Sequence, residues 1–283
     1  MTTKKEITDY YDIAEVAYRD IWHLDDCLAL HYGFWDKNTK NLKEALINEN
    51  AVLADFVNIS ADDLVLDAGC GVGGSSIFLA KKLGCTVHGI SISDLQIEKA
   101  NKNAEKNSVS HLTNFTKTDF HQTHFADNTF DVIWFLESFG HSNDRKRLLQ
   151  EAYRVLKPGG RIMLSEAITY KKSFTKKEQT IMDKWLSGWA LETVPEKDDL
   201  FNTFKEVGFS DFKLKNHTKM VQRSAFILYF YAMLALTYGK LCRLVGKQYG
   251  NEITIKNTVG TKYQYIARRK KLWEYVAISA VKK

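Results

Sequence analysis

Residues 64–74 place a single carboxyl group beside a turn that is rich in glycine. The string LVLDAGCGVGG starts with three apolar residues, continues with Asp67 and then has glycine at positions 69, 71, 73 and 74. Glycine adopts positive φ readily and lets a ligand approach the backbone where a Cβ would block it. The turn is therefore expected to bind a small nucleoside-type ligand. The adjacent acid favours a cationic ligand over the pyrophosphate that similar turns bind.

A second group of polar side chains follows the apolar run FDVIWFL at residues 130–136. The next residues read ESFGHSND and place Glu137, Ser138 and His141 in one short loop. Carboxylate and imidazole groups are side chains that take up or release a proton in catalysis. The alternative is a structural role, in which Glu137 and His141 form a hydrogen-bonded pair that shapes the loop.

Both groups of residues follow apolar runs that are typical of buried strands. Such runs stand at 64–66, 86–93, 115–120, 130–136 and 161–165, and stretches with helical spacing stand between them. Strands that alternate with helices in this way form an α/β fold with a parallel sheet. The chain of 283 residues has room for one Rossmann-like domain, with a doubly wound sheet and an added cap.

Three segments resemble class I S-adenosylmethionine-dependent methyltransferases. The string DAGCGVG at 67–73 is similar to the first motif of that family. The string GISISDLQ at 89–96 is similar to a segment of the tocopherol, sterol and cyclopropane-fatty-acid methyltransferases, and ESFGH at 137–141 resembles the Glu-Ser-x-x-His segment of the sterol and tocopherol enzymes. The resemblance implies a seven-stranded Rossmann-like sheet, S-adenosylmethionine as cofactor and transfer of a methyl group.

The resemblance also implies a role for each matching side chain. Where most class I enzymes have an acid that holds the ribose, this chain has Ser91, and Ser91 and Gln96 can hydrogen-bond a neutral diol without a charge. A turn residue and a solvated helix residue are the alternatives for these two positions. No metal ligands are expected. The implied catalytic residues are Glu137 and His141, and the implied cofactor-binding residues are Tyr32, Asp67, Gly69, Gly71, Ser91, Gln96, Asp119, Phe120 and Leu136.

Residues 1–50 are predicted to form an N-terminal helical segment that covers the cofactor. The hexapeptide HYGFWD at 31–36 resembles the His-x-Gly-Tyr/Phe-Trp segment of small-molecule methyltransferases that act on lipids, sugars and alkaloid amines. This resemblance implies that the hydroxyl group of Tyr32 reaches the methionine end of the cofactor, with Tyr11 as a second candidate. A plain aromatic cluster that seals the edge of the sheet is the alternative.

The predicted cofactor-binding core spans residues 51–170, and residues 171–283 are expected to supply helical cap inserts and the last strands of the same sheet. In the first insert, Trp185 and Trp189 indicate a helix whose aromatic side walls a pocket. The second insert contains residues 224–239 without a charge, which is shorter than the roughly 20 residues of a membrane-spanning helix. We expect a buried cap helix that lines the acceptor pocket, or alternatively a helix that enters a bilayer surface. Residues 272–283 are predicted to be an antiparallel edge strand.

Charge is distributed unevenly along the chain. Residues 1–160 contain 17 Lys or Arg and 23 Asp or Glu, whereas residues 161–283 contain 23 and 11. The basic half suits an anionic acceptor or acidic lipid headgroups, and a merely solvated basic face is equally open. Four cysteines without metal-ligand spacing indicate free thiols in a reducing compartment, the cytoplasm. The residues that follow the first methionine do not resemble a signal peptide.

The predicted function is methyl transfer from S-adenosylmethionine to a small, largely hydrophobic acceptor. An isoprenoid, quinol-like or lipid-type compound, with or without an anionic group, suits the aromatic and basic cap. A polar natural-product hydroxyl or amine is the alternative, followed by a protein that binds S-adenosylmethionine without transfer. No nucleic-acid partner is expected, because the Asn-Pro-Pro-Tyr type of motif does not stand at residues 136–139. Peripheral membrane contact and the oligomeric state remain open.

Overall fold

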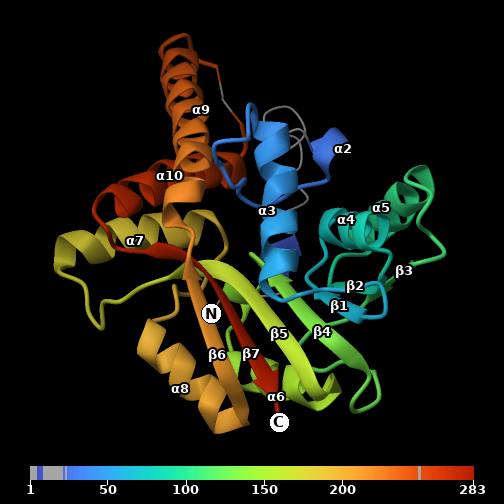
Figure 1. The fold of residues 1–283 in the computed structure, drawn as a ribbon. Helices are drawn as coiled ribbons and strands as arrows, with labels where there is room; N and C mark the ends of the chain where they lie inside the picture. Colours follow the sequence, from blue (N-terminus) through green and yellow to red (C-terminus); the bar gives the residue numbers. More distant parts are fainter. Residues whose placement is uncertain (1–4, 9–21, 23, 248–249) are drawn as a thin grey trace.

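A twisted sheet of seven strands forms the centre of the molecule (Figure 1). The computed structural model describes residues 5–8, 22, 24–247 and 250–283. The strand order is β3-β2-β1-β4-β5-β7-β6, in which β7 alone runs antiparallel to its neighbours. This is the predicted α/β fold with a doubly wound, Rossmann-like sheet. The strands are β1 Leu64–Ala68, β2 Thr86–Ser91, β3 Thr113–Lys117, β4 Phe130–Leu136, β5 Leu156–Ile168, β6 Phe209–Asn216 and β7 Glu274–Lys282.

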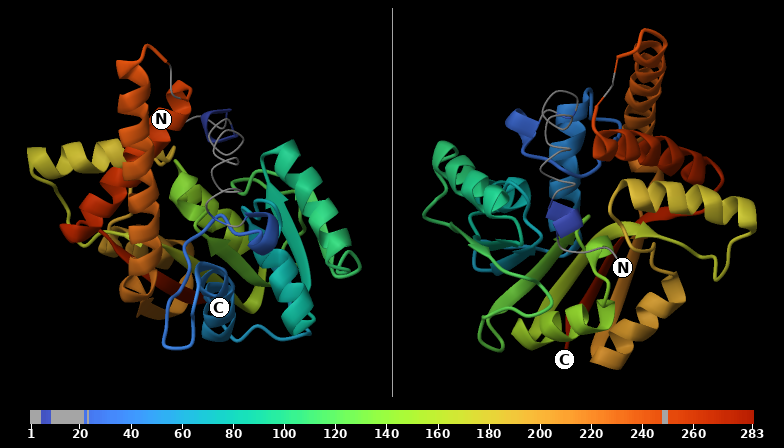
Figure 2. Two further views of the ribbon diagram at one scale, coloured as in Figure 1. Left: turned by 90° about the horizontal axis from the view of Figure 1, so that it is seen from above. Right: turned by 180° about the vertical axis from the view of Figure 1, so that it is seen from behind.

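Both faces of the sheet are buried, because side chains of the central strands alternate between two hydrophobic cores. In β4, Val132 and Trp134 belong to one core, while Ile133 and Phe135 belong to the other. The first core includes residues of α3 Leu42–Phe56, α4 Gly74–Leu83 and α5 Asp94–Lys106, and the second includes residues of α6 Arg145–Val155 and α8 Lys197–Val207. Figure 2 shows these two groups of helices on opposite sides of the sheet.

Three further helices form the cap, namely α7 Lys176–Gly188, α9 Thr218–Leu244 and α10 Glu252–Arg269. α7 and α10 cross where Gly188 meets Gly260. A Cβ on Gly188 would lie only 2.5 Å from the Cα of Gly260, so the two backbones can touch because neither residue has a side chain. α9 projects from the body of the molecule in both figures. A short helix, α2 Leu24–Cys27, and a 3₁₀ turn, η1 Phe139–His141, lie outside these groups.

Two predictions about the last part of the chain are wrong. The helix over 224–239 does not line a pocket as a buried cap, because only 22% of the apolar window in α9 is buried. Residues 272–283 do not form an edge strand, because β7 lies between β5 and β6 and has six consecutive buried residues, 275–280. The more polar β6, which is exposed over most of its length, takes the edge position.

Candidate active site

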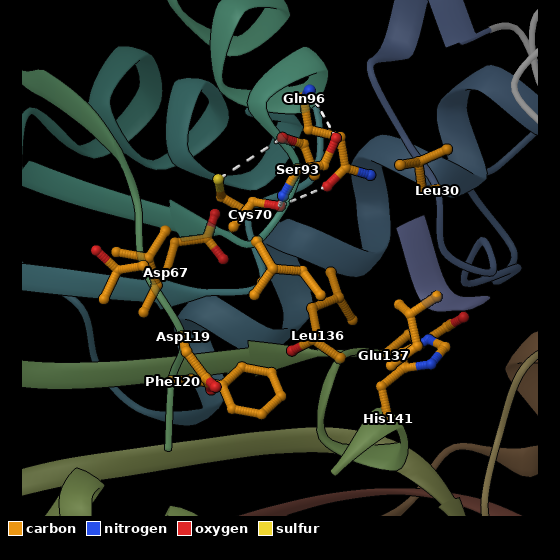
Figure 3. A pocket seen from close by; sticks show the side chains of 18 of the residues that line it. Leu30, Asp67, Cys70, Ser93, Gln96, Asp119, Phe120, Leu136, Glu137 and His141 are labelled. Carbon is orange, nitrogen blue, oxygen red and sulfur yellow. Dashed lines mark hydrogen bonds between the residues drawn. The ribbon is translucent and has the colours of Figure 1, made fainter. Parts of the chain in front are cut away.

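A large cavity of about 940 Å³ opens at the carboxyl ends of the parallel strands (Figure 3). In the close-up, Leu136 lies between Phe120 on one side and Glu137 and His141 on the other. The cavity is lined by every predicted site residue except Tyr32, namely Asp67, Gly69, Gly71, Ser91, Gln96, Asp119, Phe120, Leu136, Glu137 and His141. The tertiary structure thus gathers side chains that stand as far as 74 positions apart in the chain.

The glycine turn after β1 lines this cavity. Gly69 has a φ of 95°, and a Cβ there would collide with the side chain of Ser138. The backbone N–H groups of Gly69 and Cys70 both donate to the carbonyl oxygen of Ile90 at 2.9 Å, which ties the turn to the end of β2. α4 starts directly afterwards, so its N-terminus faces the cavity. Gly69 therefore satisfies both a conformational and a steric requirement of the turn.

Asp67, the second-last residue of β1, has a buried carboxyl group. Its Oδ2 accepts a hydrogen bond from the hydroxyl group of Ser76 at 2.6 Å. Burial raises the pKa of Asp67 to about 6, because the low-dielectric surroundings disfavour the charged form. A cation in the adjoining cavity would stabilise the ionised carboxylate, so the site suits a positively charged ligand, as the sequence predicts.

Ser91 and Gln96 form a hydrogen-bonded pair at the wall of the cavity. The hydroxyl group of Ser91 donates to Oε1 of Gln96 at 2.7 Å and accepts from the backbone N–H of Ser93 at 3.1 Å. Gln96 uses its carbonyl oxygen in this pair, which leaves its amide N–H groups as its hydrogen-bond donors. A neutral hydroxyl-bearing ligand fits these groups better than an anion or a cation does.

Asp119 and Phe120 stand in the loop after β3, which ends at Lys117 rather than continuing to residue 120 as the sequence predicts. Oδ1 of Asp119 accepts from the backbone N–H of His121 at 2.8 Å and lies 2.8 Å from Nδ1 of the same histidine. Nε2 of His121 lies 2.8 Å from the hydroxyl oxygen of Ser142. His121 thus orients Asp119 at the cavity wall, a role that the sequence analysis missed although the two residues are nearly adjacent.

A second, much smaller cavity of about 40 Å³ adjoins the first. The two share Leu30, Glu137 and His141 as lining residues. Tyr32 contributes to the smaller cavity only, so its side chain does not line the larger one as the prediction of cofactor contact requires. Tyr11 lies outside the described residues. The remaining lining residues of the smaller cavity are Glu166, Ala167, Trp185, Trp189, Leu191 and Tyr275.

Four aromatic side chains, Tyr32, Trp185, Trp189 and Tyr275, line the smaller cavity. The ring centroid of Tyr32 lies 6.1 Å from that of Trp189 and 5.6 Å from that of Tyr275. Trp185 and Trp189 meet edge to face at 6.1 Å. The two tryptophans come from the insert after β5, where their spacing of four residues predicts an aromatic wall, and both do line a pocket.

A buried hydrogen-bond network connects the smaller cavity to α3. The hydroxyl oxygen of Tyr275 lies 2.7 Å from Oε1 of Glu137 and 2.8 Å from Oε1 of Glu49. A phenol has one proton to donate, so one of these two contacts requires a carboxyl group that donates to Tyr275. Glu49 and Glu137 therefore share one proton between them. Burial, and next the mutual repulsion with Glu49, raise the pKa of Glu137 well above its ordinary value.

His141 is the other titratable group that both cavities share. Its Nδ1 lies 3.2 Å from the carbonyl oxygen of Ala190, which can only accept, so Nδ1 carries the hydrogen and Nε2 is the basic atom. Burial lowers the pKa of His141 to about 4, because it penalises the charged imidazolium. The ring is thus neutral near pH 7.

The sequence analysis missed Glu49 and Tyr275 of this network, and also Glu166, which lines the smaller cavity. Glu166 accepts a hydrogen bond from the backbone N–H of Gly140 at 3.0 Å, and burial raises its pKa to about 7. A carboxyl group inside the apolar stretch RIMLSEAI is a signal that could have identified it. Glu49 and Tyr275 have no comparable signal, because each stands alone in an ordinary amphipathic or apolar segment.

The comparison with protein families agrees with the larger cavity. Residues 66–164 match a family model described as a methyltransferase domain. The cofactor that the sequence motifs imply, S-adenosylmethionine, fits the larger cavity. Asp67 suits its positive charge, and Ser91 and Gln96 suit its neutral ribose hydroxyls.

Two curated relatives illustrate the range of the family. The chain is 37% identical to 27-O-demethylrifamycin SV methyltransferase of Amycolatopsis mediterranei over 164 residues, which cover 58% of this chain and 59% of that protein. It is 29% identical to the chloroplastic tocopherol O-methyltransferase of Arabidopsis thaliana over 240 residues, which cover 77% of this chain and 66% of that enzyme. The chain thus spans about three fifths of the first relative and two thirds of the second.

A solved structure shows the same fold over nearly the whole length. The [4+2]-cyclase SpnF superposes with a TM-score of 0.80 and 20% identity, covering 99% of this chain and 96% of the cyclase. The likeness extends through the cap helices, where the family model does not reach. At this level of identity it concerns the fold alone.

Proposed function

We propose that the protein is an S-adenosylmethionine-dependent methyltransferase that acts on a small, largely hydrophobic acceptor of isoprenoid, quinol-like or lipid type. The observation that supports this proposal most directly is the meeting of the two cavities at Glu137 and His141. The larger cavity has the polar groups that suit the cofactor, whereas the smaller one has four aromatic side chains in its lining. The site between them is where a methyl group would pass.

The chemistry of the smaller cavity supports a hydrophobic reacting end. Tyr32, Trp185 and Tyr275 are buried there, and the space beside them suits one small apolar group rather than a sugar ring. Aromatic faces also attract a positive charge, by about 0.5 to 2 kcal/mol for each contact. An acceptor that becomes cationic during alkylation would therefore be stabilised next to the rings.

S-adenosylmethionine, when bound, supplies a methyl group on a positively charged sulfur. The chain itself would hold the acceptor in line with that group, which can contribute about 7 to 11 kcal/mol to lowering the barrier. Glu137 is the proposed base for an acceptor that loses a proton. With the shared proton on Glu49, Tyr275 donates to Glu137 and leaves it ionised, and its raised pKa makes it a stronger base.

Tyr275 also allows the shared proton to move between the two carboxyl groups. Glu137 passes a proton to the hydroxyl oxygen of Tyr275 while Tyr275 passes its own proton to Glu49, an exchange that requires only one of the two carboxyl groups to be protonated. The 2.7 and 2.8 Å contacts are short enough for this exchange. Nε2 of His141 is the alternative proton acceptor, because the ring is neutral.

A polar natural-product hydroxyl or an amine is the second candidate acceptor. The 37% identical relative is named for 27-O-demethylrifamycin SV, and the carboxyl groups beside the aromatic rings would also accommodate a protonated amine. We further propose a cytoplasmic location, which the four free cysteines support.

The test uses S-adenosylmethionine with a labelled methyl group and a panel of prenyl, quinol, phenolic, amine and sugar acceptors. We expect transfer to prenyl, quinol or phenolic compounds, and a loss of that transfer in Glu137→Gln. Transfer only to amines or sugars would replace the proposed acceptor class by the second candidate. Binding of the cofactor without any transfer, across the panel, would favour a non-catalytic protein. No heat on titration of S-adenosylmethionine or S-adenosylhomocysteine would overturn the cofactor site itself.

A further inference from the structure

α9 has a continuous stripe of large apolar side chains that face solvent. The stripe consists of Phe226, Phe230, Leu234, Tyr238, Leu241 and Val245, which are 50 to 70% exposed. Successive members are three or four residues apart, so they lie on one face of the helix. Eight of the twelve exposed large hydrophobic side chains in the described residues lie between positions 226 and 245. Such a concentration is unusual on a soluble surface and marks an interaction site.

The fold does not need this stripe for its own core. The first turns of α9 are anchored by Ser224, whose hydroxyl group donates to the carbonyl oxygen of Gly33 at 3.0 Å and accepts from its N–H at 3.1 Å. The inner side packs on α10, where the rings of Tyr229 and Tyr265 stack at 4.6 Å. Phe226, at the start of the stripe, also packs on Tyr265, with 6.0 Å between the ring centroids, and the stripe from Phe230 onward stays more than half exposed.

The stretch of chain that carries the stripe has charge of one sign. Residues 218–251 contain no Asp or Glu, and the projecting end of α9 has Lys240, Arg243 and Lys247, all exposed. Figures 1 and 2 show that this end lies far from the sheet. Apolar side chains flanked by basic residues are complementary to a membrane surface with anionic headgroups. A second copy of this chain would bring only further positive charge to the same place.

We propose that the α9 stripe and its three basic neighbours bind the surface of a membrane that contains anionic lipids. The apolar side chains enter the boundary between headgroups and acyl chains, and the basic side chains contact lipid phosphates. By length and hydropathy α9 is also the one helix among those described that could cross a membrane, a weak indication by itself. Its first turns are buried in the fold, where Val221 and Ala225 are fully covered, so surface binding is the arrangement that keeps the fold intact.

Flotation with lipid vesicles tests this surface. We expect the full chain to float with vesicles of phosphatidylcholine and phosphatidylserine but not with phosphatidylcholine alone. The double variant Phe230→Ser/Leu234→Ser and the double variant Lys240→Glu/Arg243→Glu should each reduce binding about tenfold or more, since each basic residue contributes roughly fivefold near an anionic surface. Raising the salt concentration should also weaken vesicle binding by the wild-type protein, because salt screens the attraction between the basic side chains and the anionic headgroups.

Matched controls come from the edge strand β6. Leu214→Ser and Lys213→Glu change an exposed apolar and an exposed basic residue away from α9 and should leave flotation unchanged. Circular dichroism and binding of S-adenosylhomocysteine verify that each variant is folded. Absence of flotation with anionic vesicles, or equal flotation of the α9 variants and the controls, would overturn the proposal. So would a lipid-free dimer, seen by sedimentation, that Phe230→Ser/Leu234→Ser dissociates.

Discussion

The two cavities that meet at Glu137 are built in different ways. The larger one takes most of its wall from residues 67–147, a single stretch of alternating strands and helices. The smaller one combines residues from position 30 to position 275. A turn that binds a cofactor depends on local backbone geometry, whereas a pocket for the reacting end of an acceptor depends on packing between distant elements. The first kind of site can therefore be predicted from a sequence motif, and the second cannot.

The acidic side chains at the two cavities also differ, in how readily they lose their protons. Asp67 in the larger cavity has a pKa of about 6 and ionises near neutral pH. Glu137 and Glu49 beside the smaller cavity have pKa values raised mainly by burial, and they share a proton through Tyr275. The larger cavity thus suits a permanent cation, and under the proposed function the smaller one retains a proton that the reaction could move.

The largest effect is expected for Glu137→Gln. The amide keeps the size of the side chain but cannot accept a proton as a base, so the turnover number should fall about 10²- to 10⁴-fold. The dissociation constant of S-adenosylmethionine should stay within about threefold, and calorimetry beside a labelled-methyl assay measures both. Glu105→Gln, on the exposed side of α5, is the matched control. Full turnover in Glu137→Gln would make its role structural and would remove the functional contrast between the two cavities.

Gly69→Ala should damage the larger cavity next most strongly. Its φ of 95° strains an alanine by about 1 to 2 kcal/mol, and the added Cβ collides with Ser138. We expect the affinity for S-adenosylhomocysteine to fall at least about tenfold in calorimetry. Gly159→Ala separates the two causes, since Gly159 also has positive φ (75°) but open space around it. Equal losses in the two variants would show that the close approach at residue 69 has no special role.

Tyr275→Phe tests the proton-sharing network of the smaller cavity. Both Glu49 and Glu137 lose a buried partner, so the free energy of unfolding should fall by about 1 to 3 kcal/mol. Turnover should fall about tenfold with a shifted pH profile, while cofactor affinity stays unchanged. Tyr153→Phe, on the far side of the sheet, is the control. Lower stability with an unaltered pH profile of turnover would mean that Tyr275 only supports the packing.

The pH dependence of cofactor binding sharpens the electrostatic difference. Because the ionised form of Asp67 attracts a cation, affinity for S-adenosylmethionine should rise severalfold as the pH increases through about 6.

The stability of the free protein should change in the opposite direction. The folded state holds the Asp67 proton from pH 3.8 to about 6 while the unfolded state releases it, so this stabilisation is lost as the pH rises. In Asp67→Asn, calorimetry should show no rise of cofactor affinity through pH 6, and thermal denaturation should show no loss of stability in that range from residue 67. Asp62→Asn, at the surface, is the control and should behave like the wild type.

The smallest effect is expected for Ser91→Ala. One hydrogen bond of ordinary strength contributes about 1 kcal/mol, so S-adenosylhomocysteine should bind about fivefold more weakly. Adenine alone should bind equally to the two proteins, since the serine is assigned to the ribose hydroxyls. A loss that also affects adenine would show that Ser91 shapes the whole cavity instead of holding the diol.

Particular elements show where sequence reasoning succeeded. The strand-turn-helix from Leu64 to Leu83 follows from an apolar run, four glycines and helical spacing, all of which act within a few residues. The tryptophan pair at 185 and 189 predicted an aromatic wall because residues four apart share a helix face. The exposure of α9 was misjudged, since a long apolar helix is identical in sequence whether a neighbouring element covers it or not.

The amino-acid sequence by itself determined the sheet, the glycine turn and the chemistry of the cofactor pocket, because short-range backbone preferences and hydrophobic periodicity are properties of neighbouring residues. Tertiary structure alone decided that β7 is an interior strand, that Tyr32 lines the smaller cavity and that Glu49 contacts Tyr275 across 226 positions. Burial and proton sharing depend on which distant groups pack together. That information is present in the chain only as the outcome of folding.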